Sequence, residues 1–155
     1  MITASHLHAM VIHFPIALLM IGFLSEIIAL FNKKPFYVNV SLFLLVLGTI
    51  GAIISYASGS YAADGMSEGD FQKPIGMHEE AAFVTLILAI VTSLLKGAIY
   101  FFDYQKNWSN WTSLLLYIIL IGSLGRTAYL GGELVFKHGA GIELVLPDFE
   151  DSKTD

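Results

Sequence analysis

Cysteine is absent from the 155 residues of the sequence. This absence excludes disulfide bonds, thiolate-bound zinc, iron–sulfur ligation and haem attached through a C-x-x-C-H motif. A metal centre in this chain must therefore use imidazole, carboxylate, thioether or carbonyl ligands. A phosphate-binding glycine loop and an H-E-x-x-H helix are also missing, since His78-Glu79-Glu80 has no second histidine at the required spacing. We expect an electron-transfer or binding subunit rather than a stand-alone enzyme.

Charged residues are scarce. They make up 14% of the chain, whereas hydrophobic residues make up 55%. So little polar surface does not cover a soluble globule of this size, which indicates a protein of the lipid bilayer. The net charge of −5 and the lack of a basic cluster exclude nucleic acid as a partner.

Long apolar runs dominate what is present. Each is close to the roughly 20 residues that cross a bilayer as a helix. We predict transmembrane helices at about residues 9–31, 38–61, 78–102 and 110–132. The runs are continuous rather than alternating, which excludes a β-barrel. The first run lacks a basic n-region and a clear cleavage site, so we expect it to be retained.

The predicted fold is an all-α, integral membrane four-helix bundle with up-down-up-down topology. It occupies residues 1–141, and residues 142–155 form an acidic C-terminal tail. Basic residues mark two of the connections, with Asn32-Lys33-Lys34 in the first and Lys96 and Lys106 flanking the other. Because cytoplasmic loops are enriched in lysine and arginine, both termini are expected to be extracytoplasmic.

Five histidines fall on that extracytoplasmic side: His6, His8, His13, His78 and His138. Pro15 suits a first helical turn, so helix one is expected to begin near His13, and His78 begins helix three at comparable depth. The leading hypothesis is haem b held between His13 and His78 on diagonal helices. Gly59 would leave room for the ring, and a buried Arg126 would bind a propionate or a protein carboxylate.

Two other hypotheses stay open. One is a zinc, iron or copper ion held by His13, His78 and His138, with His8, Asp64 or Glu79 as further ligands. The other is a cofactor-free structural subunit, either of a larger complex or of an oligomer, whose histidines form a hydrogen-bond network. In either case residues 62–77 cross the outer surface as a loop or as a lid over the histidines.

Helical spacing predicts which faces point inward. Small and polar residues line one face of helix two from Gly48 to Ala62 and one face of helix three from His78 to Lys96. On helix four the expected inward residues are Ile118, Gly122, Arg126, Tyr129 and Glu133. Glu26 and Lys96 lie at similar depth on parallel helices, and we expect them to pair.

Two segments carry a resemblance to a known family. Leu7-His8-Ala9-Met10-Val11-Ile12-His13-Phe14-Pro15-Ile16-Ala17-Leu18-Leu19 and Gly131-Gly132-Glu133-Leu134-Val135-Phe136-Lys137-His138-Gly139-Ala140-Gly141 resemble the bacterial membrane-protein family called domain of unknown function 2231. Gly59, Asp64 and His78 look like its intervening pattern, and the likeness covers nearly the whole chain. The sequence departs from the pattern at Ala9, where many members carry proline.

The resemblance implies a four-helix module of the bacterial cytoplasmic membrane. Family members are sometimes joined to cytochrome c-like or iron–sulfur domains, so it also implies redox work. The expected role is electron transfer between the quinone pool and an extracytoplasmic partner such as a c-type cytochrome. The protein would set the ligands and the surroundings of the cofactor.

Overall fold

The computed structural model describes residues 3–32, 34–64, 71–104 and 106–141. In these ranges the chain forms four long helices and no strand: α1 (Ala4–Phe31), α2 (Pro35–Asp64), α3 (Gln72–Phe101) and α4 (Asn107–Phe136). All four are long and apolar enough to cross a membrane. The predicted all-α four-helix membrane bundle is therefore confirmed, whereas the predicted acidic tail lies outside the described residues.

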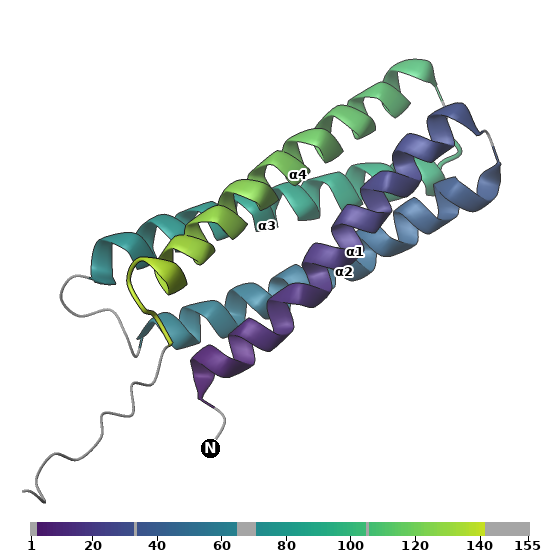
Figure 1. Cartoon of the computed structure of the whole chain (residues 1–155). Helices are drawn as coiled ribbons and strands as arrows, with labels where there is room; N and C mark the ends of the chain where they lie inside the picture. The colour runs from purple at the N-terminus through teal and green to yellow at the C-terminus, as the bar shows by residue number, and fades with distance from the viewer. Residues whose placement is uncertain (1–2, 33, 65–70, 105, 142–155) are drawn as a thin grey trace, which may run out of the picture.

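The helices run up and down in chain order and form two hairpins, α1–α2 and α3–α4 (Figure 1). Packing is closest within each hairpin and looser between α2 and α3 and between α1 and α4. In the described ranges, the diagonal pair α1 and α3 makes no close backbone approach. We call the end where α1 begins and α4 ends the histidine end, and the end with the two hairpin turns the ion-pair end.

Each helix is longer than its apolar run. α1 begins at Ala4 rather than near His13, because Thr3 caps it by accepting a hydrogen bond from the His6 N–H, and Pro15 lies inside the helix. α3 begins at Gln72 instead of residue 78, and its early Pro74 is tolerated where few N–H groups have helical partners. Hydrophobicity marks the part of a helix that crosses lipid, and these helices continue beyond it.

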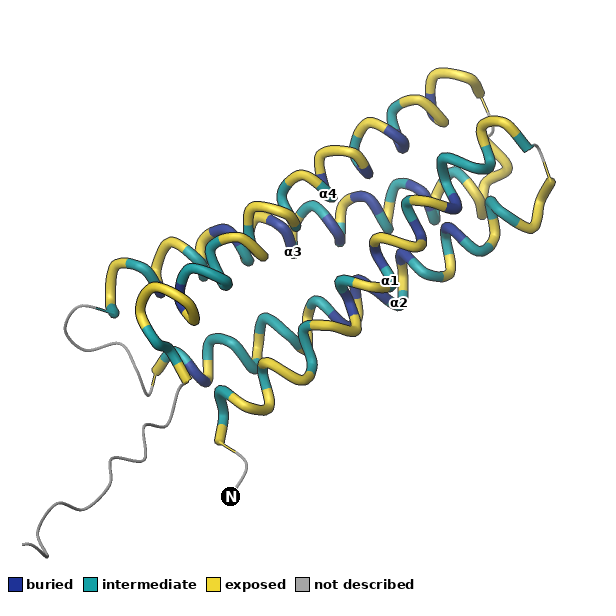
Figure 2. Tube along the Cα trace, in the orientation of Figure 1, coloured by how far each residue is buried: buried dark blue, intermediate teal, exposed yellow. Residues whose placement is uncertain are grey.

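The centre of the bundle is small and apolar. Five fully buried residues form the core cluster: Leu19, Leu45, Ala89, Tyr117 and Leu120. Buried residues face the inside along the helices, and exposed residues, which include many large hydrophobic side chains, face outward (Figure 2). An outward apolar surface of this kind is expected where the surrounding solvent is lipid.

Hydroxyl groups connect the helices inside the bundle. Thr49 on α2 and Ser93 on α3 lie 2.7 Å apart between their hydroxyl oxygens. Thr85 on α3 contacts Ser123 and Thr127 on α4, at 2.7 and 2.8 Å. Small residues and interhelical hydrogen bonds hold membrane helices together where the hydrophobic effect does not discriminate between lipid and protein.

Candidate functional site

At the histidine end, His8 of α1 packs against Ser58 and Gly59 of α2, and His78 of α3 packs against α4. Both side chains are half-buried. Because α1 and α3 are diagonal in the bundle, the two imidazoles belong to different hairpins. This pair is the centre of the candidate site.

Hydrogen bonds fix the same tautomer in both rings. His78 Nδ1 lies 3.1 Å from the Thr127 carbonyl oxygen, which only accepts, so Nδ1 carries the proton. His8 Nδ1 lies 3.1 Å from Ser58 Oγ, and this hydroxyl already donates to the Ser55 carbonyl at 2.9 Å. His8 Nδ1 is therefore also a donor. In each neutral ring Nε2 keeps its lone pair, the arrangement found in histidines that bind metals.

A glycine makes room for each ring. A Cβ atom at Gly59 would lie 2.9 Å from His8 Cε1, and one at Gly131 would lie 3.1 Å from His78 Cε1. Gly59 comes directly after Ser58, the partner of His8, and Gly131 comes one turn after Thr127, the partner of His78. Without a side chain at these positions, the imidazole reaches the helix backbone.

The two halves of the site correspond residue by residue. His8 and His78 are seventy positions apart in the sequence, and so are Glu26 and Lys96. Gly59 and Gly131 are seventy-two positions apart, as are the starts and the ends of α2 and α4. The hairpins α1–α2 and α3–α4 therefore share much of their residue spacing, and the two histidines occupy corresponding positions in it.

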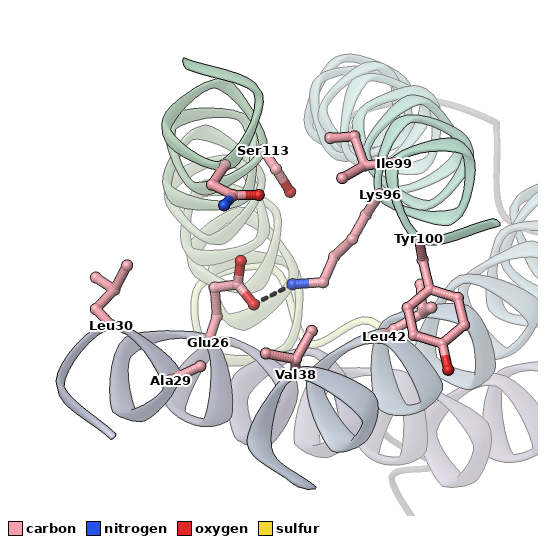
Figure 3. A pocket seen from close by; sticks show the side chains of 10 residues that line it. Glu26, Ala29, Leu30, Val38, Leu42, Lys96, Ile99, Tyr100 and Ser113 are labelled. Atoms are coloured by element: carbon pink, nitrogen blue, oxygen red, sulfur yellow. Dashed lines mark hydrogen bonds and ion pairs between the residues drawn. The ribbon is translucent and has the colours of Figure 1, made fainter. Parts of the chain in front are cut away.

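Glu26 and Lys96 at the ion-pair end lie on the same faces of α1 and α3 as His8 and His78. Glu26 lies eighteen residues after His8, and Lys96 lies eighteen residues after His78, which is five complete turns in each helix. The Lys96 ammonium donates to the Glu26 carboxylate (Figure 3). Both side chains are largely buried. The predicted pairing of Glu26 with Lys96 is confirmed.

His13 and His138 do not join the pair of histidines. His13 is exposed on α1, where its Nδ1 donates to the Ala9 carbonyl at 2.7 Å. His138 is exposed beyond α4 and packs edge-on against Phe71, with 6.5 Å between the ring centroids. His8, which the sequence placed only among the secondary ligands, is half-buried at the histidine end like His78.

The remaining candidates are also separated. Glu79 accepts a hydrogen bond from Ser60 at 2.8 Å, and Asp64 is exposed at the end of α2. No three histidine, aspartate or glutamate side chains form a group that could hold a metal ion in the described part of the chain. The predicted surface segment at residues 62–77 is shorter than expected, because residues 62–64 belong to α2 and residues 72–77 belong to α3. Residues 65–70 lie outside the described residues, so a role as a lid stays a prediction.

The expected inward face of α4 is corrected. Arg126 and Tyr129 are exposed, and Gly122 faces open space. The buried face of α4 instead includes Ser113, Tyr117, Leu120 and Leu134. Arg126 has no ion pair within the described ranges. A pattern in the sequence could have indicated the inward face of α4. Its residues Ser113, Tyr117, Leu120, Thr127 and Gly131 have the same spacing as Ser41, Leu45, Gly48, Ser55 and Gly59 on α2.

The glycine-rich end of α4 turns back toward the start of α1. Gly139 has a positive φ of 69°, and its N–H donates to the Val135 carbonyl, a common way to end a helix. Gly141, at φ 79°, then comes beside Ser5: a Cβ atom on it would lie 3.6 Å from Ser5 Cβ. The described residues after α4 thus pack beside the histidine end.

Comparison with known proteins gives a family and no function. A family described as a predicted membrane protein, DUF2231, matches residues 4–144. No curated protein matches the chain. No solved structure matches it either. Because the match covers nearly the whole sequence, the chain belongs to the DUF2231 family of predicted membrane proteins.

Proposed function

We propose that this protein is a small membrane redox module that binds haem b between His8 and His78. The observation that carries the proposal is the pair of imidazoles on diagonal helices, each with Nδ1 committed to a hydrogen bond and Nε2 available. Axial imidazole ligands of haem are oriented by such bonds from the second ring nitrogen. Bound haem would supply one-electron chemistry.

The donor set fits haem better than it fits a bare zinc ion. The porphyrin provides four equatorial nitrogens, so two imidazoles complete the coordination of the iron. Structural zinc requires four protein ligands and catalytic zinc usually three. Gly59 and Gly131 hold the rings against the backbone. The sequence-based choice of His13 with His78 gives way in this proposal to His8 with His78.

The proposed setting is the bacterial cytoplasmic membrane, with the histidine end facing away from the cytoplasm. The lysines near the hairpin turns, among them Lys34 and Lys106, support this orientation. In that arrangement the module relays electrons between the quinone pool and an extracytoplasmic partner such as a c-type cytochrome. The chain's own residues hold the rings, fix their tautomers and limit the access of water.

The test is an absorption spectrum of the protein purified in detergent after expression with a haem precursor. We expect a Soret band, low-spin α and β bands on reduction, and one haem per chain. His8→Ala and His78→Ala should each lose the pigment. His13→Ala is the matched control, because it removes an exposed histidine from the same helix as His8, and it should keep the spectrum.

Three results would overturn the assignment. Pigment lost in His13→Ala but kept in His8→Ala restores the original ligand pair, His13 and His78. A stoichiometric zinc, iron or copper ion without porphyrin indicates a metal-binding protein. Neither pigment nor metal after supplementation indicates a structural subunit of a larger membrane complex.

A further inference from the structure

We propose that the ion-pair end holds a second ligand site, a pocket for a single aromatic ring that carries a hydroxyl group and a second oxygen, as in a quinol or a phenol with an oxygen substituent. The pocket lies among all four helices around Glu26 and Lys96 (Figure 3). It is five turns, about 27 Å, from the histidines along the same helices. The inference therefore does not depend on haem, and it concerns binding alone.

The size and the walls of the pocket suit a ring. The cavity measures about 130 Å³. A dry cavity of roughly 150 Å³ in another protein is known to accept benzene. Apolar side chains form much of its lining: Leu30, Val38, Leu42 and Ile99. Such walls favour a flat apolar body over a hydrated ion.

The polar groups of the pocket define the substituents. Lys96 has three N–H donors, of which Glu26 takes one, and the Glu26 carboxylate has further acceptor positions. A ligand hydroxyl would donate to Glu26, and a ligand oxygen would accept from Lys96. Because the two charges balance, a neutral ligand is favoured over an anion.

Ser113 supplies the independent evidence for a ligand. It lines the pocket, its side chain is 3% exposed, and its hydroxyl oxygen has no hydrogen-bond partner. A buried hydroxyl without a partner is uncommon, because the missing bond costs about 1–3 kcal/mol. A ligand oxygen in the pocket would satisfy it. Asn110 and Tyr100 also line the pocket and are exposed, so they stand at its opening.

The chain carries its own probe for this site. It has two tryptophans, Trp108 and Trp111, which flank Asn110 on α4. We would titrate the purified full-length protein in lipid nanodiscs with 2-methyl-1,4-benzoquinol and follow tryptophan fluorescence. The dimethyl ether of the quinol is the matched ligand control, because it has the same ring and no O–H donor. Saturable quenching is expected with the quinol and at least tenfold weaker binding with the ether.

Variants separate the pocket from general effects. Ser113→Ala should weaken quinol binding about fivefold, the usual effect of losing one hydrogen bond. Val38→Phe, which fills the pocket with an apolar ring, should abolish binding without removing a charge. Ser41→Ala is the matched control, since Ser41 is equally buried and unpartnered but does not line the pocket. It should bind like the unchanged protein.

The effect of an alkyl tail on quinol affinity distinguishes a membrane ligand from a soluble one. Tighter binding of a quinol with a decyl chain indicates the membrane quinol pool, and binding of the tailless quinol alone indicates a soluble phenol. Either result supports the pocket. Equal binding of quinol and ether, no saturable binding, or full binding by Val38→Phe would overturn it, and a bound phospholipid displaced by neither compound would make the site a lipid site.

Discussion

The histidine end and the ion-pair end use equivalent positions of the same two helices for different chemistry. At one end, α1 and α3 present His8 and His78, whose protons go to a hydroxyl and a carbonyl of α2 and α4. At the other end the same faces present Glu26 and Lys96, which bond to each other. Each imidazole bonds to the neighbouring helix of its own hairpin, whereas the ion pair joins the two hairpins. The same helix faces thus make contacts within each hairpin at one end and connect the two hairpins at the other.

Loss of one partner of the ion pair should give the largest effect. We expect Lys96→Met to destabilise the protein by about 3–5 kcal/mol, because Glu26 would stay buried without a partner. The double variant Glu26→Leu/Lys96→Leu should recover most of this loss, since no charge is left unpaired. Unfolding in mixed detergent by circular dichroism measures both, with the exposed Lys34→Met as control. Equal losses in the single and double variants would contradict this account of the ion-pair end.

A methyl group beneath each imidazole tests the histidine end. Gly59→Ala and Gly131→Ala should each cost about 1–2 kcal/mol, because the new Cβ meets a ring held against the backbone. Gly59→Ala should be the worse, since its contact is the closer, 2.9 Å against 3.1 Å. Gly122→Ala enters open space and should be neutral or slightly stabilising. The same unfolding assay applies, and three identical responses would show that the rings are not confined by these glycines.

Removal of a hydrogen bond from the core between the two ends should lower the free energy of unfolding by a moderate amount. Tyr117 is fully buried, and its hydroxyl donates to the Leu19 carbonyl across 3.1 Å. Tyr117→Phe should cost about 1 kcal/mol, the usual value for one hydrogen bond. Tyr129→Phe, which removes an exposed hydroxyl from the same helix, is the control. A larger loss in the control would mean that α4 packs with its opposite face toward the bundle.

The smallest effect is expected at the exposed ion pair of the histidine end. Lys137 donates to Glu133, and this bond raises the pKa of the lysine above its ordinary value. Both groups are open to water, where such pairs contribute little. Lys137→Ala should therefore leave the unfolding transition unchanged within error. A shift comparable with that of Lys96→Met would show that burial does not separate the two ion pairs.

Local features of the sequence were sufficient for the architecture. The number of helices follows from the number of apolar runs, because each run has about the 20 residues that a helix needs to cross a bilayer. The depth of Glu26 and Lys96 follows from counting residues along parallel helices, since each residue adds a fixed rise of about 1.5 Å. Their pairing was predictable because an intramembrane charge needs a partner at its own depth.

The rotation of each helix about its own axis was decided only by the tertiary structure. In water, an apolar stripe marks the inward face of a helix, but in lipid both faces are apolar and the stripe carries little information. For this reason we predicted from the sequence that Arg126 faces inward and that His13 rather than His8 is the ligand on helix one. In the structure Arg126 and His13 are exposed. Gly59 and Gly131 acquire their meaning only when the neighbouring helices bring His8 and His78 against them. The sequence by itself determined how many helices cross the membrane and at what depth each polar group lies, and the packing of the two hairpins determined which of those groups meet.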